Sequence, residues 1–302
     1  MDTPAILLVI ELHAPSPPCL ARALMLTRYL HARLDILVYP QLSIPGLSPG
    51  VVRQRQEEAG ECVAALRRSI VAPDVEITIE LASGGPMSDA IVDKARQNHY
   101  ALIIKAPWQQ VRSRRDPNDW QLMRRCPVPL LLTAGRPWHP KARFLAVIDV
   151  LNPRGVGQRE AILEAANALR LACAAELDLG HIEPANSHDP AQDAGAARMQ
   201  LERLGQRYDL AASRLHQLGG RTTEPLRLFV SEREYDLLIV GVANEIQAPW
   251  PPSIGPALAQ SLSATDCDLL MIQESEKVQS VLTGQRLLRW SPFPLWQWLG
   301  TD

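Results

Sequence analysis

Ala5-Ile-Leu-Leu-Val-Ile-Glu11 is a short apolar run that ends in an acid, and Phe144-Leu-Ala-Val-Ile-Asp149 repeats this pattern 138 residues later. Two further pairs of similar stretches follow at spacings of 135 and 141 residues: Tyr100-Ala-Leu-Ile-Ile with Tyr235-Asp-Leu-Leu-Ile, and Cys126-Pro-Val-Pro-Leu-Leu-Leu with Cys267-Asp-Leu-Leu-Met-Ile. All three spacings are close to half of the 302-residue chain. A repeat of this kind indicates two copies of one domain.

Apolar runs of strand length alternate with helical patterns in both halves. The runs are Ala5–Ile10, Leu34–Tyr39, Val75–Glu80, Leu102–Lys105 and Val128–Thr133 in the first half, and Phe144–Val150, Glu176–Ile182, Leu237–Gly241 and Leu269–Gln273 in the second. They show little polar alternation, which is typical of strands buried on both faces of a parallel sheet. The sequence therefore predicts an α/β fold with two mostly parallel, doubly wound five-stranded sheets flanked by helices.

The composition of the chain between the copies sets their boundaries. Gly135-Arg-Pro-Trp-His-Pro-Lys141 is punctuated by proline, as linkers are. We predict a first domain over residues 1–134, a second over 142–274 and a tryptophan-rich C-terminal tail over 275–302. A third strand in the second domain is left open, because only Gly219–Glu224 separates a helix predicted over Ala194–Gln217 from one over Pro225–Glu234.

The overall composition limits the class of protein. The chain has 31 Lys and Arg residues against 33 Asp and Glu residues, so it lacks the basic excess of a dedicated nucleic-acid-binding protein. A hydrophobic fraction of 46% excludes a fully disordered chain. No apolar run approaches the ~18 residues of a transmembrane helix. The five cysteines are scattered without a CxxC pair, which indicates neither disulfides nor a metal site. We expect a soluble, cytoplasmic protein.

Occurring twice in the same order, these stretches resemble the universal stress protein family, and in particular its tandem two-domain, E-type-like branch. The resemblance covers roughly residues 3–134 and 142–274 and implies two Rossmann-like domains in a protein of the stress response. Domains of this family pair through their last strands. This implies that Val128–Thr133 and Leu269–Ile272 pair within the one chain as a pseudo-dimer, which would cover two sheet edges. A homodimer of the whole chain is left open.

Family members that bind ATP carry the pattern G-x-x-G and, after about nine residues, G-S or G-T, because glycines let the backbone approach the phosphates. In the first half the equivalent stretch starts with Lys105-Ala-Pro-Trp108 and contains no glycine up to residue 126, so the resemblance implies no nucleotide there. The second half keeps Gly241, replaces the second glycine with Asn244, and has Gly255 followed by proline. With Asp149, expected near the adenine, these residues form a candidate ATP site.

Cationic side chains gather near the lost phosphate loop of the first half. They are Lys105, Arg112, Arg114, Arg115, Arg124 and Arg125. We interpret them as a solvated face, with a site for an anion or an acidic partner as the alternative.

Four aromatic residues lie within nine positions of the C-terminal tail. They are Trp290, Phe293, Trp296 and Trp298. Exposed apolar segments of this kind invite association. We expect the tail to dock on its own domain, with a protein partner and peripheral membrane contact as the alternatives.

No catalytic group of residues emerges from the sequence. His13 and His31 lie near the first strand and helix, but no serine or cysteine with nucleophile-elbow spacing accompanies them. Any enzymatic activity would be slow ATP hydrolysis at the second-half loop. Three function classes remain: a non-catalytic stress-response binding or adaptor protein, which the damaged loops favour, an ATP or AMP sensor that uses the second domain, and a carrier of an apolar ligand in a cleft closed by the tail.

Overall fold

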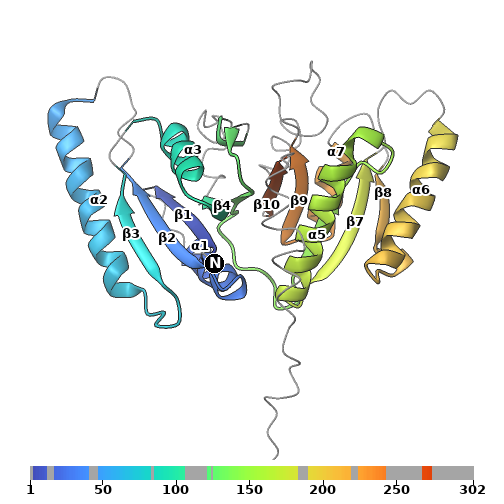
Figure 1. Ribbon diagram of the computed structural model, residues 1–302, viewed down its shortest axis with the longest axis horizontal. Coiled ribbons are helices and arrows are strands. Elements are labelled where there is room, and N and C mark those ends of the chain that lie inside the picture. Colours follow the sequence, from blue (N-terminus) through green and yellow to red (C-terminus); the bar gives the residue numbers. More distant parts are fainter. Residues whose placement is uncertain are drawn as a thin grey trace, which may run out of the picture.

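Ten strands form one continuous sheet in the computed structural model, which describes residues 3–11, 17–40, 47–82, 85–105, 121–123, 125–182, 190–218, 224–242 and 267–273 (Figure 1). The N-terminal half contains β1 (Ala5–Glu11), α1 (Pro17–Tyr29), β2 (Arg33–Tyr39), α2 (Pro49–Ser69), β3 (Ile77–Leu81), α3 (Met87–Gln97), β4 (Tyr100–Lys105) and β5 (Leu130–Leu132). The C-terminal half contains β6 (Arg143–Val147), η1 (Pro153–Gly155), α5 (Val156–Ala172), β7 (Glu176–Ile182), α6 (Pro190–Arg207), η2 (Ala212–Arg214), β8 (Leu215–Leu218), α7 (Glu224–Glu232), β9 (Leu237–Val242) and β10 (Asp268–Gln273).

The two halves share one topology and meet at their last strands. The sheet order is β3-β2-β1-β4-β5-β10-β9-β6-β7-β8, so each half has the same order outward from the junction. Every pair within a half is parallel, whereas β5 and β10 pair antiparallel with Leu132 opposite Leu269 and Leu130 opposite Met271. The predicted α/β fold is therefore confirmed, and so is the predicted pairing of the last strands within one chain.

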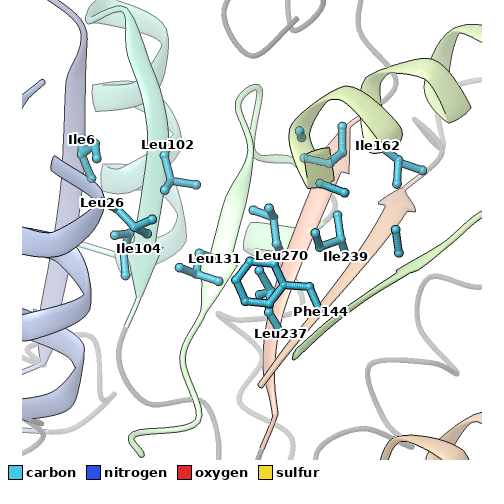
Figure 2. Packing of buried hydrophobic residues seen from close by; sticks show 14 of the residues in the cluster. Ile6, Leu26, Leu102, Ile104, Leu131, Phe144, Ile162, Leu237, Ile239 and Leu270 are labelled. Atoms are coloured by element: carbon cyan, nitrogen blue, oxygen red, sulfur yellow. The ribbon is translucent and has the colours of Figure 1, made fainter. Parts of the chain in front are cut away.

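The strands are buried on both faces, which explains their lack of polar alternation. In β1, Ile6, Leu8 and Ile10 pack on the face covered by α1, α2, α5 and α6. Leu7 and Val9 pack on the opposite face, which is covered by α3 and α7. The first of these cores crosses the junction without a break, since Leu131 of β5 and Leu270 of β10 both belong to it (Figure 2).

The third strand of the C-terminal half is present. Strand β8 (Leu215–Leu218) pairs parallel with β7 at the edge of the sheet. The helix predicted to continue to Gln217 ends at Arg207 instead, and the 3₁₀ turn η2 leads from it into β8. The predicted helix is thus ten residues too long at its C-terminus.

The early end of α6 has a conformational cause. Asp209 adopts the left-handed conformation with φ 53°, and the Leu210 N–H donates to the Gly205 carbonyl at 2.8 Å. This is the hydrogen bond of a Schellman C-cap. Helices α1, α5 and α7 end in the same way at His31, Ala174 and Glu234. Because none of these capping residues is glycine, the usual sequence signal for a helix end is missing.

A buried aspartate at the start of β10 holds the linker between the halves. Asp268 is 1% exposed and accepts hydrogen bonds from the Ala134 N–H at 2.7 Å and from Trp138 Nε1 at 3.0 Å. It also forms an ion pair with Arg22 of α1, whose guanidinium lies 3.7 Å from the centre of the Trp138 ring. Burial raises the pKa of Asp268 despite the Arg22 charge. Helix α1, the linker and β10 are therefore connected through one carboxylate.

A second buried aspartate, Asp236, anchors the other end of the linker just before β9. It accepts hydrogen bonds from the backbone N–H groups of His139 at 3.1 Å and Arg143 at 3.0 Å. Its carboxylate also pairs with the Arg136 guanidinium at 3.0 Å. The proline-punctuated linker is thus fixed to the sheet by two carboxylates, Asp236 and Asp268. We call these residues and their partners the linker clamp.

Candidate functional site

The candidate nucleotide site lies at the carboxyl edge of the sheet in the C-terminal half. Strands β6 and β9 are parallel neighbours with Val147 opposite Val240, so Asp149 and Gly241 follow at adjacent strand ends. In open α/β sheets, ligands bind outside the carboxyl ends of the strands. Asn244 and Gly255, the other two predicted site residues, lie outside the described residues.

Asp149 organises the loop that leads from β6 to α5. Its Oδ1 accepts hydrogen bonds from the N–H groups of Leu151 at 3.1 Å and Asn152 at 3.2 Å, which is the geometry of an Asx turn. The side chain is 44% exposed, so the carboxylate also faces solvent. Among the described residues, its nearest ionisable partner is His181, whose Nδ1 lies 4.0 Å from Oδ1.

His181 of β7 is a site residue that the sequence does not reveal. The ring is fully buried, with Nδ1 3.3 Å from the Ile148 carbonyl oxygen and 3.5 Å from the Val150 nitrogen. Its Nε2 has no hydrogen-bond partner among the described residues. By sheet register the equivalent residue of the N-terminal half is Val38, which is also fully buried. Only a comparison of the two halves would have exposed this exchange of an apolar residue for a titratable one.

Gly241 is in close contact with a side chain from α5. A Cβ on Gly241 would lie 2.5 Å from Cδ, 2.7 Å from Oε1 and 2.8 Å from Nε2 of Gln158. The Gln158 Nε2 is buried and has no hydrogen-bond partner among the described residues. The neighbouring Arg159 donates from its guanidinium to the Val150 carbonyl at 3.2 Å. The first turns of α5 thus place a carboxamide and a guanidinium at the candidate site.

The carboxyl ends of the first and fourth strands of each half form what we call its corner, and Asp149 and Gly241 mark the corner of the C-terminal half. In the N-terminal half this corner holds an ion pair. Lys105 at the end of β4 is 1% exposed, and its Nζ lies 2.6 Å from Oε1 of Glu11 at the end of β1. Lys105 was predicted to belong to a solvated cationic face, and that prediction is wrong because the ammonium group is buried beside Glu11. By the repeat spacing its counterpart is Val240. Arg112, Arg114 and Arg115 lie outside the described residues.

The amino edge of the sheet carries a tyrosine–aspartate pair in both halves. The Tyr100 hydroxyl donates to Asp35 at 2.9 Å, and the Tyr235 hydroxyl donates to Asp178. Burial and these hydrogen bonds raise the pKa of both tyrosines. The pairs recur at equivalent positions and lie opposite the candidate site, so we assign them to the fold.

Asp178 has more partners than Asp35. It also accepts from Arg214 at 2.9 Å and from His216 Nε2 at 3.0 Å. Burial by itself raises the pKa of the Asp178 carboxyl, but the hydrogen bonds from His216, Tyr235 and Arg214 outweigh it and hold that pKa below its ordinary value. The ionised carboxylate is therefore the form that the folded C-terminal half favours.

The predicted docking residues Trp290, Phe293, Trp296 and Trp298 lie outside the described residues, so the role of the tail stays a prediction. None of the described helices combines the length and the apolar character needed to cross a membrane.

Comparison with known proteins identifies relatives of this architecture. No protein-family model matches the sequence. A universal stress protein E homologue of Haemophilus influenzae is 22% identical over 228 residues, which cover 68% of this chain and 72% of the relative. The crystal structure of a putative universal stress protein from Pseudomonas aeruginosa UCBPP-PA14 covers 93% of this chain and 97% of its own, with 19% identity and a TM-score of 0.69.

A universal stress protein from Archaeoglobus fulgidus has a similar structure, with 15% identity, a TM-score of 0.66 and coverage of 90% of this chain and 97% of its own. These two structures bear on the fold, and the Haemophilus protein supplies the match in sequence. Together they confirm the resemblance found in the repeated stretches: this chain is similar in sequence to a universal stress protein and has the fold of the tandem universal stress proteins.

Proposed function

We propose that this chain is a stress-response protein of the universal stress protein type that acts by binding rather than by catalysis. The observation that carries the proposal is the occupancy of both corners by the chain's own side chains. Lys105 and Glu11 fill the corner of the N-terminal half, and Gln158 covers Gly241 in the C-terminal half. A protein with both corners closed is suited to present surfaces to a partner.

The N-terminal corner is the more firmly closed of the two. A buried lysine is costly to separate from its carboxylate, because an unpaired buried charge loses hydration without compensation. A nucleotide in this corner would have to lie beside the Lys105–Glu11 ion pair or separate it. We therefore assign the N-terminal half no nucleotide.

A second candidate function is nucleotide sensing by the C-terminal half. Asp149 favours it, because its partly exposed carboxylate lies at the same sheet edge as Gly241. The group that covers Gly241 is the end of a flexible side chain, which can move at lower cost than backbone. In this alternative ATP or AMP binds near Asp149 and Gly241, and Asn244 and Gly255 complete the loop.

Analysis of released nucleotide decides between the two candidates. The freshly purified full chain is denatured, and any nucleotide is identified by chromatography and mass spectrometry, followed by calorimetric titration with ATP. We expect no nucleotide and no heat up to millimolar ATP. One ATP or AMP per chain, lost in a Gly255→Arg variant that still folds, would replace the binding-only proposal with nucleotide sensing.

A further inference from the structure

The side chain of Gln158 lies close to the α-carbon of Gly241. The three outer atoms of the carboxamide lie at 2.5, 2.7 and 2.8 Å from the position that a Cβ of Gly241 would occupy. Because these distances are nearly equal, the face of the amide group points at the Cβ position of residue 241. Any residue with a Cβ would collide with all three atoms.

Backbone conformation does not explain the glycine at this position. Among the described residues only Gly85 and Gly135 are glycines with positive φ, so Gly241 has a backbone that other residues can adopt. It is the next-to-last residue of β9, and a glycine in a strand often marks the close approach of another group. The approaching group here is the side chain of Gln158.

The two halves differ at both positions of this contact. By the repeat spacings, Gln158 corresponds to Leu20 and Gly241 corresponds to Ala106. Leu20 packs against the apolar core, as expected of a residue on α1 that faces the sheet. The C-terminal half therefore combines a polar side chain on the helix with the loss of a methyl group on the strand.

We infer that Gln158 is a side-chain plug and that Gly241 is retained as its binding surface rather than for the approach of a phosphate. The plug covers the α-carbon of Gly241. A ligand reaches Gly241 only after the carboxamide rotates away.

A double-mutant cycle tests the contact itself. Four proteins are compared by thermal unfolding: the wild type, Gly241→Ala, Gln158→Ala and the double variant. We expect Gly241→Ala to lower Tm by about 2 °C in the wild type, because the added methyl group displaces the Gln158 carboxamide from its contact. In the Gln158→Ala background the same change shifts Tm by less than about 1 °C, because the colliding group is gone. Equal losses in both backgrounds overturn the inference.

A matched control separates this coupling from general effects of alanine. Gly60 of α2 has no atom within 4 Å of its Cβ position, so Gly60→Ala gives the same Tm shift with and without Gln158. If Gly241→Ala alone does not fold, the double variant decides. A double variant that unfolds at the Tm of Gln158→Ala supports the plug, and a double variant that also fails to fold rejects it.

ATP titration tests whether Gln158 hinders access to Gly241, and this second experiment rests on the nucleotide-sensing candidate. We expect Gln158→Ala to bind ATP at least about tenfold more tightly than the wild type, which corresponds to about 1.4 kcal/mol. Equal measurable affinities overturn the closing role. If neither protein binds ATP, nucleotide sensing fails as a function, and the double-mutant cycle alone decides whether Gly241 is the binding surface of Gln158.

Discussion

The two halves of this chain carry an acid at the same place, the end of the first strand, and use it in opposite ways. Glu11 is mostly buried and pairs with Lys105 from the neighbouring strand end. Asp149 is 44% exposed, and among the described residues it accepts hydrogen bonds from the N–H groups of its own loop. The difference arises at one neighbour, because the position of Lys105 is taken by Val240 in the C-terminal half. The half with a lysine at this position buries its acid in an ion pair, and the half with a valine leaves its acid partly exposed.

The opposite edge of the sheet shows what both halves keep. Each places a tyrosine at or just before the start of its fourth strand and an aspartate in its second, and the two side chains are hydrogen-bonded in both halves. Sites that only maintain the fold have remained alike, while the edge that binds ligands in related folds has diverged. This contrast supports separate roles for the two halves rather than two copies of one site.

The largest expected effect is the difference in stability between variants of the two acids. Glu11→Gln removes the carboxylate that pairs with the buried Lys105 ammonium, so the free energy of unfolding falls by about 3–5 kcal/mol in urea titrations. The matched change Asp149→Asn in the C-terminal half keeps the acceptor of the Asx turn and costs less than about 0.5 kcal/mol.

The reference for this measurement is an apolar replacement of the whole pair. Glu11→Leu combined with Lys105→Met removes both charges, so the double variant regains most of the lost stability. If Glu11→Gln and Asp149→Asn cost the same, the ion pair does not distinguish the two corners.

A smaller difference in stability is expected between variants of the two tyrosine–aspartate pairs. Tyr100→Phe removes a hydroxyl donor from Asp35 and lowers the free energy of unfolding by about 1.5–3 kcal/mol, as expected for a hydrogen bond to a charged group. Tyr235→Phe costs about 1 kcal/mol or less, because Asp178 keeps Arg214 and His216. Urea unfolding of both variants measures the difference, and a larger loss for Tyr235→Phe contradicts it.

The sequence was sufficient for the features that depend on local pattern. Continuous apolar runs predicted the buried strands because each face of the sheet is covered by helices, and the repeat predicted the pairing of β5 with β10. Strand β8 could not be predicted with the same certainty, because Leu-His-Gln-Leu is short and half polar and because Asp209 ends α6 without a glycine. These failures concern helix ends and sheet edges, where local signals are weakest.

The site was only partly predictable, because its contacts join distant parts of the chain. Asp149 and Gly241 could be predicted because they lie at strand ends. Lys105 and Glu11 are 94 residues apart, and neither stretch of sequence indicates that they form an ion pair. Gln158 and His181 looked like ordinary helix and strand residues. The contacts of these two residues form between helices and strands that come together only when the parallel sheet folds.

The smallest expected effect, acid sensitivity through Asp178, tests whether the extra partners of that carboxylate matter. Its pKa is lowered in the folded state, so its stabilising contribution is complete above the ordinary pKa near 4 and is lost as the pH falls through the lower folded value. Unfolding in urea at pH 7, 5, 4 and 3 should therefore show the stability difference between wild type and Asp178→Asn shrinking below about pH 4. Other carboxylates titrate in both proteins and cancel in the difference. A gap that stays constant down to pH 3 would mean that Arg214, His216 and Tyr235 hold Asp178 without stabilising its charge.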